Sequence, residues 1–181
     1  MADSYCTYVA SGRANPVHNA YHDNEYGFAT DDEAELFERL VLEINQAGLS
    51  WETVLKKRDS FREAYCGFEV DAVAALDEAD MERILQNAGV IRNRQKVRAA
   101  ITNAQAVQKL REQYGSFHGW LQAMGPKTLE EWVKLFRKTF VFMGPEIVRE
   151  FLVSTGHLPG AHDDECPIYA AVLASGPTWK S

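Results

Sequence analysis

Several common sequence features are scarce or missing in this 181-residue chain, and each absence excludes a class of protein. The three cysteines, Cys6, Cys66 and Cys166, are too few and too scattered for a disulfide framework. No apolar run approaches the length of a membrane span, and the first ten residues lack the basic and then apolar pattern of a signal peptide. We therefore expect a cytoplasmic protein with no membrane partner.

Strand signals are equally scarce. No segment alternates convincingly between apolar and polar side chains, and the chain has no internal repeat, low-complexity tract or linker. It also lacks a glycine-rich phosphate loop and a nucleophile elbow. A formal net charge of -7 argues mildly against a nucleic-acid partner, although local patches decide such contacts. The length fits a single domain over residues 1–181, or two small lobes.

The sequence does contain a series of amphipathic helices separated by short turns. The first is predicted to begin at a capping box of Thr30 and Glu33 and to run to about Ala47. Gly48 supplies the left-handed turn that ends it, and Ser50 is placed to cap the next helix. We expect an irregular segment over residues 1–29 and an all-α fold, with further helices at about 51–58, 60–66, 71–76, 77–87, 92–114, 117–124, 128–139 and 145–154.

A carboxylate and an aromatic ring flank the end of the first predicted helix. Glu43 lies at the edge of the apolar face, where it is partly desolvated and needs a partner. Trp51 follows directly after the turn, so the two side chains are able to border one cavity. The residues alone favour a simpler alternative, a salt-bridged Glu43 and a packed Trp51. Tyrosines near the chain start also fill either a core or a pocket wall: Tyr8, Tyr21 and Tyr26.

Cysteine and histidine pairs occur at both ends of the chain. Cys6 and His22 lie near the start, and His162 and Cys166 are four residues apart near the end. A Cys2His2 group is a normal closed tetrahedral zinc site, and here it would staple the two termini together. Unliganded residues are the alternative, and other histidines compete as ligands: His18 and His157. Four protein ligands leave no open position, so such a metal would be structural.

Two features are typical of DNA binders. The segment Phe140–Pro145 joins two predicted helices, and Gly144 exposes backbone N–H groups to a phosphate at a helix start. Basic side chains also occur in three runs. One run by itself is more often a solvated face, but three on an acidic chain favour a segregated basic surface. The runs are Lys56–Arg58, Arg92–Arg98 and Lys134–Lys138.

Taken together, these motifs resemble the 3-methyladenine DNA glycosylase I family of the helix-hairpin-helix DNA glycosylase superfamily. The resembling segments span nearly the whole chain in the family's order: Tyr21–Gly27, Gln46–Trp51, Val54–Arg58, Ala88–Arg94, the hairpin Phe140–Pro145, and His162 with Cys166. The resemblance implies an all-α, helix-hairpin-helix glycosylase-like fold with zinc-stapled N- and C-termini and a base pocket between two lobes.

The resemblance also implies roles for single residues. Glu43 matches the base-recognising carboxylate and is the expected catalytic residue. The expected base-binding rings are Tyr21 and Trp51, which bracket the extruded base, with Tyr26 and Tyr8 beside them. The implied ligands of a structural zinc are Cys6, His22, His162 and Cys166. The expected contacts to the DNA backbone are Gly144, Lys138 and Lys57.

Three departures from the family pattern leave the range of lesions open. Ile44 and Asn45 follow Glu43 where the family has Gly and Gln, and tyrosines stand at positions 8 and 26 where the family has tryptophans. The implied reaction is hydrolysis of the N-glycosidic bond of N3-methylated adenine flipped out of alkylated double-stranded DNA. It releases free 3-methyladenine, and we expect a monomer.

The residues after the hairpin bear on the type of glycosylase. Many superfamily members carry a Schiff-base lysine there, but this chain has Gly144, Pro145 and Glu146, so strand cleavage is not expected. Asp163 and Asp164 are interpreted as acidic surface at the metal site. The alternative function is a non-catalytic DNA-lesion or DNA-structure binding module on the same scaffold. A metallohydrolase is a weaker alternative because it needs an open zinc position.

Overall fold

The structure, a computed structural model, describes residues 4–180, and all regular secondary structure in that part of the chain is helical. The all-α prediction is therefore confirmed. Two compact units are present. Residues 31–148 form one, here called the central unit, and the segments 1–30 and 149–181 contribute to the other, the terminal unit. None of the helices in residues 4–180 combines the length and apolar character needed to cross a membrane.

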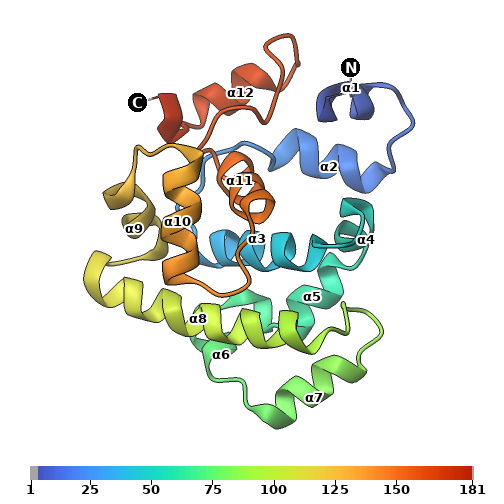
Figure 1. Cartoon of the computed structure of the whole chain (residues 1–181). Helices are drawn as coiled ribbons and strands as arrows, with labels where there is room; N and C mark the ends of the chain where they lie inside the picture. Colours follow the sequence, from blue (N-terminus) through green and yellow to red (C-terminus); the bar gives the residue numbers. More distant parts are fainter. Residues whose placement is uncertain (1–3, 181) are drawn as a thin grey trace. The chain divides into compact units, whose positions relative to one another are not determined.

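Helices of the central unit are labelled in Figure 1. They are α3 (Glu33–Gln46), α4 (Trp51–Lys56), α5 (Arg58–Ala64), α6 (Val70–Ala74), α7 (Glu78–Gln86), α8 (Arg94–Tyr114), α9 (Phe117–Met124) and α10 (Leu129–Thr139), with a 3-10 turn, η1, at Cys66–Phe68. The terminal unit contains α1 (Tyr5–Ala10), α2 (Pro16–Asn24), α12 (Tyr169–Ala174) and a 3-10 turn, η2, at Thr178–Lys180. Helix α11 (Pro145–Ser154) starts in the central unit and ends in the terminal unit.

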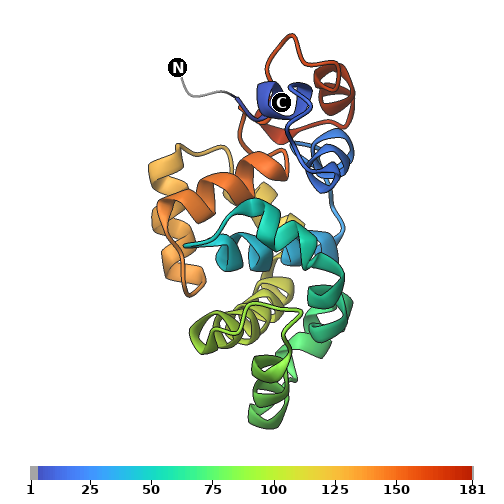
Figure 2. The ribbon, with the colours of Figure 1, turned by 90° about the vertical axis from the view of Figure 1, so that its right-hand side faces the viewer.

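The core of the central unit is built on α3 and α8. The apolar side chains that recur at helical spacing along α3 are fully buried: Leu36, Phe37, Leu40, Val41 and Ile44. Ala47, also expected on this face, is the C-cap and is partly exposed. Helix α8 packs on α3, α6, α7 and α9. Figure 1 shows it lengthwise as the longest helix of this unit, and Figure 2 views it closer to its axis. Full burial of one large apolar side chain contributes about 1.5–3 kcal/mol, so this face fixes α3 firmly.

A second part of the same core is aromatic. Helices α9 and α10 bring large rings together, and Trp120 contacts Trp132, Phe136 and Phe140 with ring centroids 5.4 to 6.4 Å apart. The inter-ring angles are tilted or edge-on, which is the arrangement that aromatic quadrupoles favour. This cluster anchors α10 and the start of the loop that follows it.

Most predicted helix ends are correct. Ser50 caps α4, and Thr128 and Glu131 form a reciprocal capping box at α10. The predicted box of Thr30 is wrong: Asp32 is the N-cap of α3, and its carboxylate accepts a hydrogen bond from the Glu35 N–H at 2.9 Å. Several candidate caps stand side by side in this segment, and the helix begins directly after the last of them.

The prediction of an irregular N-terminal segment is also wrong. Ser4 caps α1, and Asn15 caps α2, which has Pro16 at its first position. Helix α1 has only six residues, too few for a clear periodic pattern, and α2 buries His18, Tyr21 and His22 rather than an apolar stripe. Short helices of this kind take their stability from tertiary packing rather than propensity. The same reason explains why α12 was not predicted.

Candidate functional site

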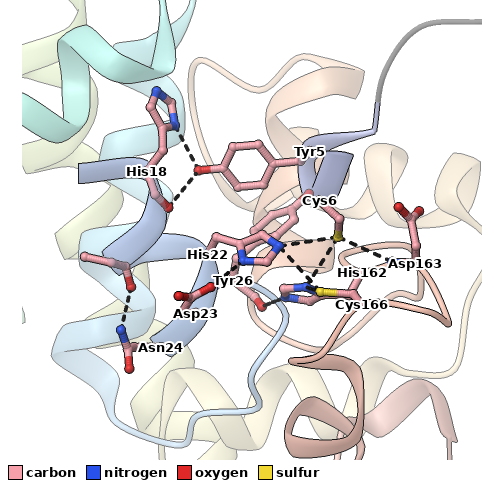
Figure 3. Close-up of polar contacts among 11 residues, drawn as sticks. Tyr5, Cys6, His18, His22, Asp23, Asn24, Tyr26, His162, Asp163 and Cys166 are labelled. Carbon is pink, nitrogen blue, oxygen red and sulfur yellow. Dashed lines mark hydrogen bonds and ion pairs between the residues drawn. The ribbon is translucent and has the colours of Figure 1, made fainter. Parts of the chain in front are cut away.

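The four predicted metal ligands lie together in the terminal unit. The ligand atoms of Cys6, His22, His162 and Cys166 are all within 4.8 Å of one another. Each Sγ lies 3.4 to 3.8 Å from each ligating ring nitrogen, and Figure 3 shows the two rings and two sulfurs converging. In a tetrahedral zinc site with ordinary bond lengths this nitrogen–sulfur edge is about 3.6 Å. The group is therefore able to hold a metal ion.

The outer nitrogens of both rings have acceptors. His162 Nε2 lies 2.7 Å from the Tyr26 carbonyl oxygen, and His22 Nδ1 lies 2.7 Å from a carboxylate oxygen of Asp23. A carbonyl only accepts, so His162 carries its proton on Nε2 and turns the lone pair of Nδ1 toward the sulfurs. Asp23 directs His22 in the same way. The hydrogen-bond network thus turns one ring nitrogen of each histidine toward the two sulfurs, as metal coordination would require.

Burial also shapes the charges of the cluster. Burial raises the pKa of the Cys6 thiol to about 11, with the neighbouring Cys166 sulfur acting in the same direction. Burial lowers the pKa of His162, which favours the neutral imidazole that metal coordination requires. A cavity of about 460 Å³ opens beside the cluster and gives it a path to solvent, with Cys6, His22 and Cys166 among its lining residues.

The competing histidines are engaged elsewhere. The Nδ1 atom of His18 lies 2.9 Å from the Tyr5 hydroxyl (Figure 3), and that of His157 lies 2.9 Å from the Thr155 hydroxyl. Neither belongs to the Cys2His2 group found among residues 4–180. The structure thus settles an alternative that the sequence left open.

Asp163 borders the Cys2His2 group. Its backbone N–H donates to Cys6 Sγ at 3.5 Å, and its carboxylate accepts a hydrogen bond from the Ser4 hydroxyl at 2.5 Å. The orienting role of Asp23 was missed by sequence reasoning. A carboxylate directly after a candidate histidine ligand was the available signal.

The predicted base-binding tyrosines form a group in the terminal unit. Tyr21 and Tyr26 are buried, with ring centroids 5.6 Å apart. The Tyr26 hydroxyl donates to Glu150 at 3.2 Å, and its backbone carbonyl orients His162. Tyr8 is partly exposed on α1. Because Tyr26 contacts the cluster, a metal held there would also fix the position of this ring.

Glu43 and Trp51 lie in the central unit, on helices that pack against each other. Glu43 is only 4% exposed near the end of α3, and Trp51 is partly exposed at the start of α4. The turn between them is tight: Gly48 has φ of +79°, and the Leu49 N–H donates to the Gln46 carbonyl at 2.8 Å. A left-handed residue is required here, which explains the glycine.

Lys96 of α8 contacts this turn, which the sequence did not predict. Lys96 was expected to belong to a solvated basic run, but it is buried and its ammonium donates to the carbonyls of Asn45 and Ala47 at 2.8 and 2.6 Å. It therefore satisfies acceptors that the end of α3 leaves open. Nothing in the local sequence indicates this role, because a lysine within a cationic run is indistinguishable from its solvated neighbours.

Other basic side chains of the three runs also bind groups of the protein itself, so they are less available to bind DNA phosphates than expected. Lys56 pairs with Glu52, Arg58 with Glu38, and Lys134 with Glu130. Arg94 and Arg98 both contact Glu78. Lys57 donates to the Ala88 carbonyl at 2.7 Å. The structure does not support the prediction that the three runs form one segregated basic surface.

The loop between α10 and α11 leaves its backbone accessible. A side chain at Gly144 would meet no atom within 4 Å, so the start of α11 is open to an incoming group. Lys138 is exposed in the last turn of α10, and Arg137 donates to the Met143 carbonyl at 3.2 Å. An anion approaching this helix start would meet backbone N–H groups and nearby positive charge.

Comparison with known proteins decides the family. Residues 11–134 match the methyladenine glycosylase family. The chain belongs to this family. It is 36% identical to a DNA-3-methyladenine glycosylase of Haemophilus influenzae, in a match that covers 81% of this chain and 89% of that protein. It is 48% identical to DNA-3-methyladenine glycosylase 1 of Escherichia coli over 98 residues, which is 54% of this chain and 52% of that protein.

Solved structures of methyladenine glycosylases have the same fold. A crystal structure of a variant 3-methyladenine DNA glycosylase I in complex with 3-methyladenine matches 88% of this chain and 95% of that chain, with a TM-score of 0.80 and 31% identity. The enzyme from Staphylococcus aureus also gives a TM-score of 0.80, at 31% identity, and the match covers 93% of this chain and 97% of that chain. The family resemblance inferred from the motifs is therefore confirmed.

Proposed function

We propose that this protein is a monofunctional DNA glycosylase that hydrolyses the N-glycosidic bond of N3-methylated adenine in alkylated double-stranded DNA. Membership of the methyladenine glycosylase family makes it a glycosylase for alkylated bases. The observation that carries the narrower assignment is the buried Glu43 carboxylate near the end of α3, the helix that the Gly48 turn joins to Trp51 at the start of α4. A related enzyme crystallised with 3-methyladenine supports the choice of base.

The chemistry of the substrate explains why few catalytic groups are needed. Methylation at N3 gives adenine a positive charge, so the sugar–base bond is weakened and the base departs neutral. The enzyme must extrude the nucleotide, at a cost of a few kcal/mol, and then favour the transition state over the bound substrate. Water attacks the sugar and leaves an abasic site and free 3-methyladenine.

Each proposed base-binding residue has a distinct task. Ionised Glu43 accepts hydrogen bonds from the edge of the base that carries the exocyclic amine. The rings of Tyr21 and Trp51 stack on the cationic base, and such cation–π contacts contribute about 0.5–2 kcal/mol each. We assign Tyr26 and Tyr8 to neighbouring positions in base binding. Unmodified adenine gains less because its ring is neutral and its glycosidic bond is intrinsically stable.

We assign DNA-backbone contacts to the loop between α10 and α11. Its open Gly144 and the exposed Lys138 support this role, and Lys57 supplies further positive charge. This assignment makes the loop the hairpin of a helix-hairpin-helix motif. No lysine follows Gly144, so no Schiff-base nucleophile is available at the superfamily's usual position. Borohydride treatment during turnover should therefore trap no covalent adduct with DNA.

The metal proposed for the Cys2His2 group is zinc. Two thiolates and two imidazoles are its usual structural ligands, and the nitrogen–sulfur distances fit its tetrahedral geometry. With four protein ligands it would link chain segments and take no part in the hydrolysis. The DNA substrate and the scattered cysteines support a cytoplasmic location, and we expect a monomer.

A deciding experiment measures the bases released from methylated DNA. Purified protein should release 3-methyladenine in single-turnover conditions, and 7-methylguanine as well if the pocket is broader. Glu43→Gln should slow release about 10- to 150-fold, because hydrogen bonds to charged groups contribute about 1.5–3 kcal/mol. The matched control is Glu35→Gln, at an exposed position of the same helix.

The same experiment tests the rival function. A non-catalytic DNA-lesion binding module would bind methylated duplex without releasing any base. Such a module would need the loop between α10 and α11 and the Cys2His2 group, but it would not need Glu43 together with the aromatic rings proposed to stack on the base. Undiminished release by folded Glu43→Gln and Trp51→Ala variants would remove these residues from the mechanism.

A further inference from the structure

Two loops of the central unit carry exposed apolar side chains. Four large hydrophobic residues are at least 36% exposed among residues 4–180. Leu49 lies in the turn after α3, and Val141 and Phe142 lie in the loop before α11; the fourth is Tyr114, at the end of α8. The two loops lead into the segments assigned above to base binding and to the DNA backbone, Trp51 and Gly144. The groups that hold these two loops in place therefore bear on binding.

The loop before α11 is held by Asn103 of α8. This asparagine is fully buried, and its side-chain amide donates to the Val141 carbonyl at 3.1 Å while its oxygen accepts from the Val141 N–H at 2.9 Å. Arg137 holds the Met143 carbonyl from the other side. Phe142, between these two anchors, has φ of +62°. A non-glycine residue keeps such a strained backbone only where its surroundings enforce it.

The turn after α3 is held by Lys96, which lies on α8 like Asn103. Its ammonium bonds to the carbonyls of Asn45 and Ala47, which bracket the end of α3 just before Gly48. A cation at this end also interacts favourably with the helix dipole. Burial lowers the pKa of Lys96, which reflects the cost of keeping an ammonium group out of water.

Both anchors stand on one face of one rigid element. Lys96 and Asn103 are seven residues apart on the 21-residue α8, which is about two helical turns and about 10 Å of rise. Each reaches backbone atoms of its loop rather than side chains, so each fixes where the loop lies whatever residues it displays. Together they set the distance between the two loops.

We propose that Lys96 and Asn103 are positioning residues, which use the face of α8 to hold the Gly48 turn and the Val141–Met143 loop in fixed register for DNA. This inference rests on the proposed function. The Gly48 turn leads directly into Trp51, so Lys96 governs the base-binding side. The other loop leads into Gly144, so Asn103 governs contact with the DNA backbone.

Simple packing would be satisfied by apolar residues at these positions. A buried ammonium and a buried amide are costly unless fully paired, and an apolar side chain of similar size often stabilises a fold at least as well. The two polar groups therefore act by determining loop position. Such a positioning role predicts that the two substitutions have separate effects, whereas a purely structural role predicts that both lower all functions together.

The test uses hydrogen exchange and two binding measurements on the full chain. Asn103→Ala should raise amide exchange at least about tenfold in residues 140–144 only, and Lys96→Met should do so in residues 44–50 only. Asn103→Ala should weaken binding to a duplex containing a tetrahydrofuran abasic analogue about tenfold and leave the affinity for free 3-methyladenine unchanged. Lys96→Met should weaken binding of free 3-methyladenine by a similar factor.

Matched and graded variants keep the test decisive. Thr102→Ala and Lys109→Met change exposed positions of the same helix and should change no readout. Asn103→Asp keeps the acceptor for the Val141 N–H but loses the donor to the Val141 carbonyl, so it should give an intermediate effect. Lys96→Gln keeps a neutral donor, and it replaces Lys96→Met if that variant fails to fold. Unchanged exchange in the folded variants would overturn the proposal, as would equal losses in both binding measurements.

Failure of this proposal is distinguishable from failure of the proposed function. If the wild-type protein releases no base from methylated DNA, the glycosylase assignment fails whatever the variants do. If the wild type is active and the folded variants bind both probes normally, only the positioning role is refuted. The exchange measurement needs no DNA and reports on the anchors in either case.

Discussion

Replacing Cys166 by serine should remove the bound metal and lower the melting temperature substantially. A metal held by the four ligands would tie together distant parts of the chain; His22 and Cys166, for example, are separated by 144 positions. Cross-linking a loop of this size lowers the conformational entropy of the unfolded chain by an amount equivalent to about 5 kcal/mol. In a protein of this length, one kcal/mol corresponds to about 2–4 °C, so the expected loss is about 10–20 °C.

The assay combines metal analysis with thermal unfolding. Wild-type protein should carry about one zinc per chain, and the Cys166→Ser variant almost none, because a neutral hydroxyl is a poor substitute for a thiolate. Chelator-treated wild type should melt where the variant melts. Cys66→Ser is the control, since Cys66 is exposed and lies outside the cluster.

The opposite result would refute the reasoning. If wild-type protein contains no metal after expression with ample zinc, and Cys166→Ser melts within a few degrees of it, then the cluster is no staple. In that case the hydrogen bonds among the four side chains suffice to hold the terminal unit together.

Three further changes test other parts of the structure. Gly27→Ala should destabilise the protein by about 2–4 kcal/mol in urea unfolding, because φ is +85° there and the added Cβ would lie 2.5 Å from the Ala161 Cβ; an unchanged midpoint would contradict the close approach of these two segments. Thr128 hydrogen bonds hold the pKa of Glu131 below its usual value of 4.5, so this carboxylate stabilises the fold above that pH and the stabilisation is lost as pH falls through the lowered pKa. The stability difference between wild type and Glu131→Gln should therefore shrink between about pH 6 and pH 3 in urea titrations, and a constant difference would refute the linkage. Glu43→Asp should retain the fold by circular dichroism but release 3-methyladenine at least about tenfold more slowly, because the carboxylate is withdrawn by one methylene; equal rates would argue against a direct contact with the base.

The local features of the helices could be predicted from the sequence. The apolar spacing of α3, the glycine after it and the start of α10 at Thr128 depend only on residues within a few positions of one another, and all appear as predicted. The bounds of α9 and α11 were also predicted. The helices at both ends of the chain were not predicted, because α1 and α12 have six residues each and α2 buries polar and aromatic side chains rather than an apolar stripe.

The candidate metal site was also predicted only in part from the sequence. Family motifs selected Cys6, His22, His162 and Cys166, yet the spacing alone left His18 and His157 as rivals. Only the folded chain shows that the rival histidines hydrogen-bond to hydroxyl groups while four distant residues converge. Convergence of this kind depends on long-range packing, for which local sequence carries no signal.

The surroundings of the charged side chains were the feature that the sequence predicted least and the tertiary structure decided most. The sequence by itself determined an all-α chain, the approximate extents of its longer helices and the residue types available for base and metal binding. Tertiary structure decided that Lys96 is a buried anchor rather than a solvated cation and that Arg94 is paired with Glu78 and Glu82. The physical reason is that the energy of a charge depends on what surrounds it in space, and those neighbours come from elsewhere in the chain.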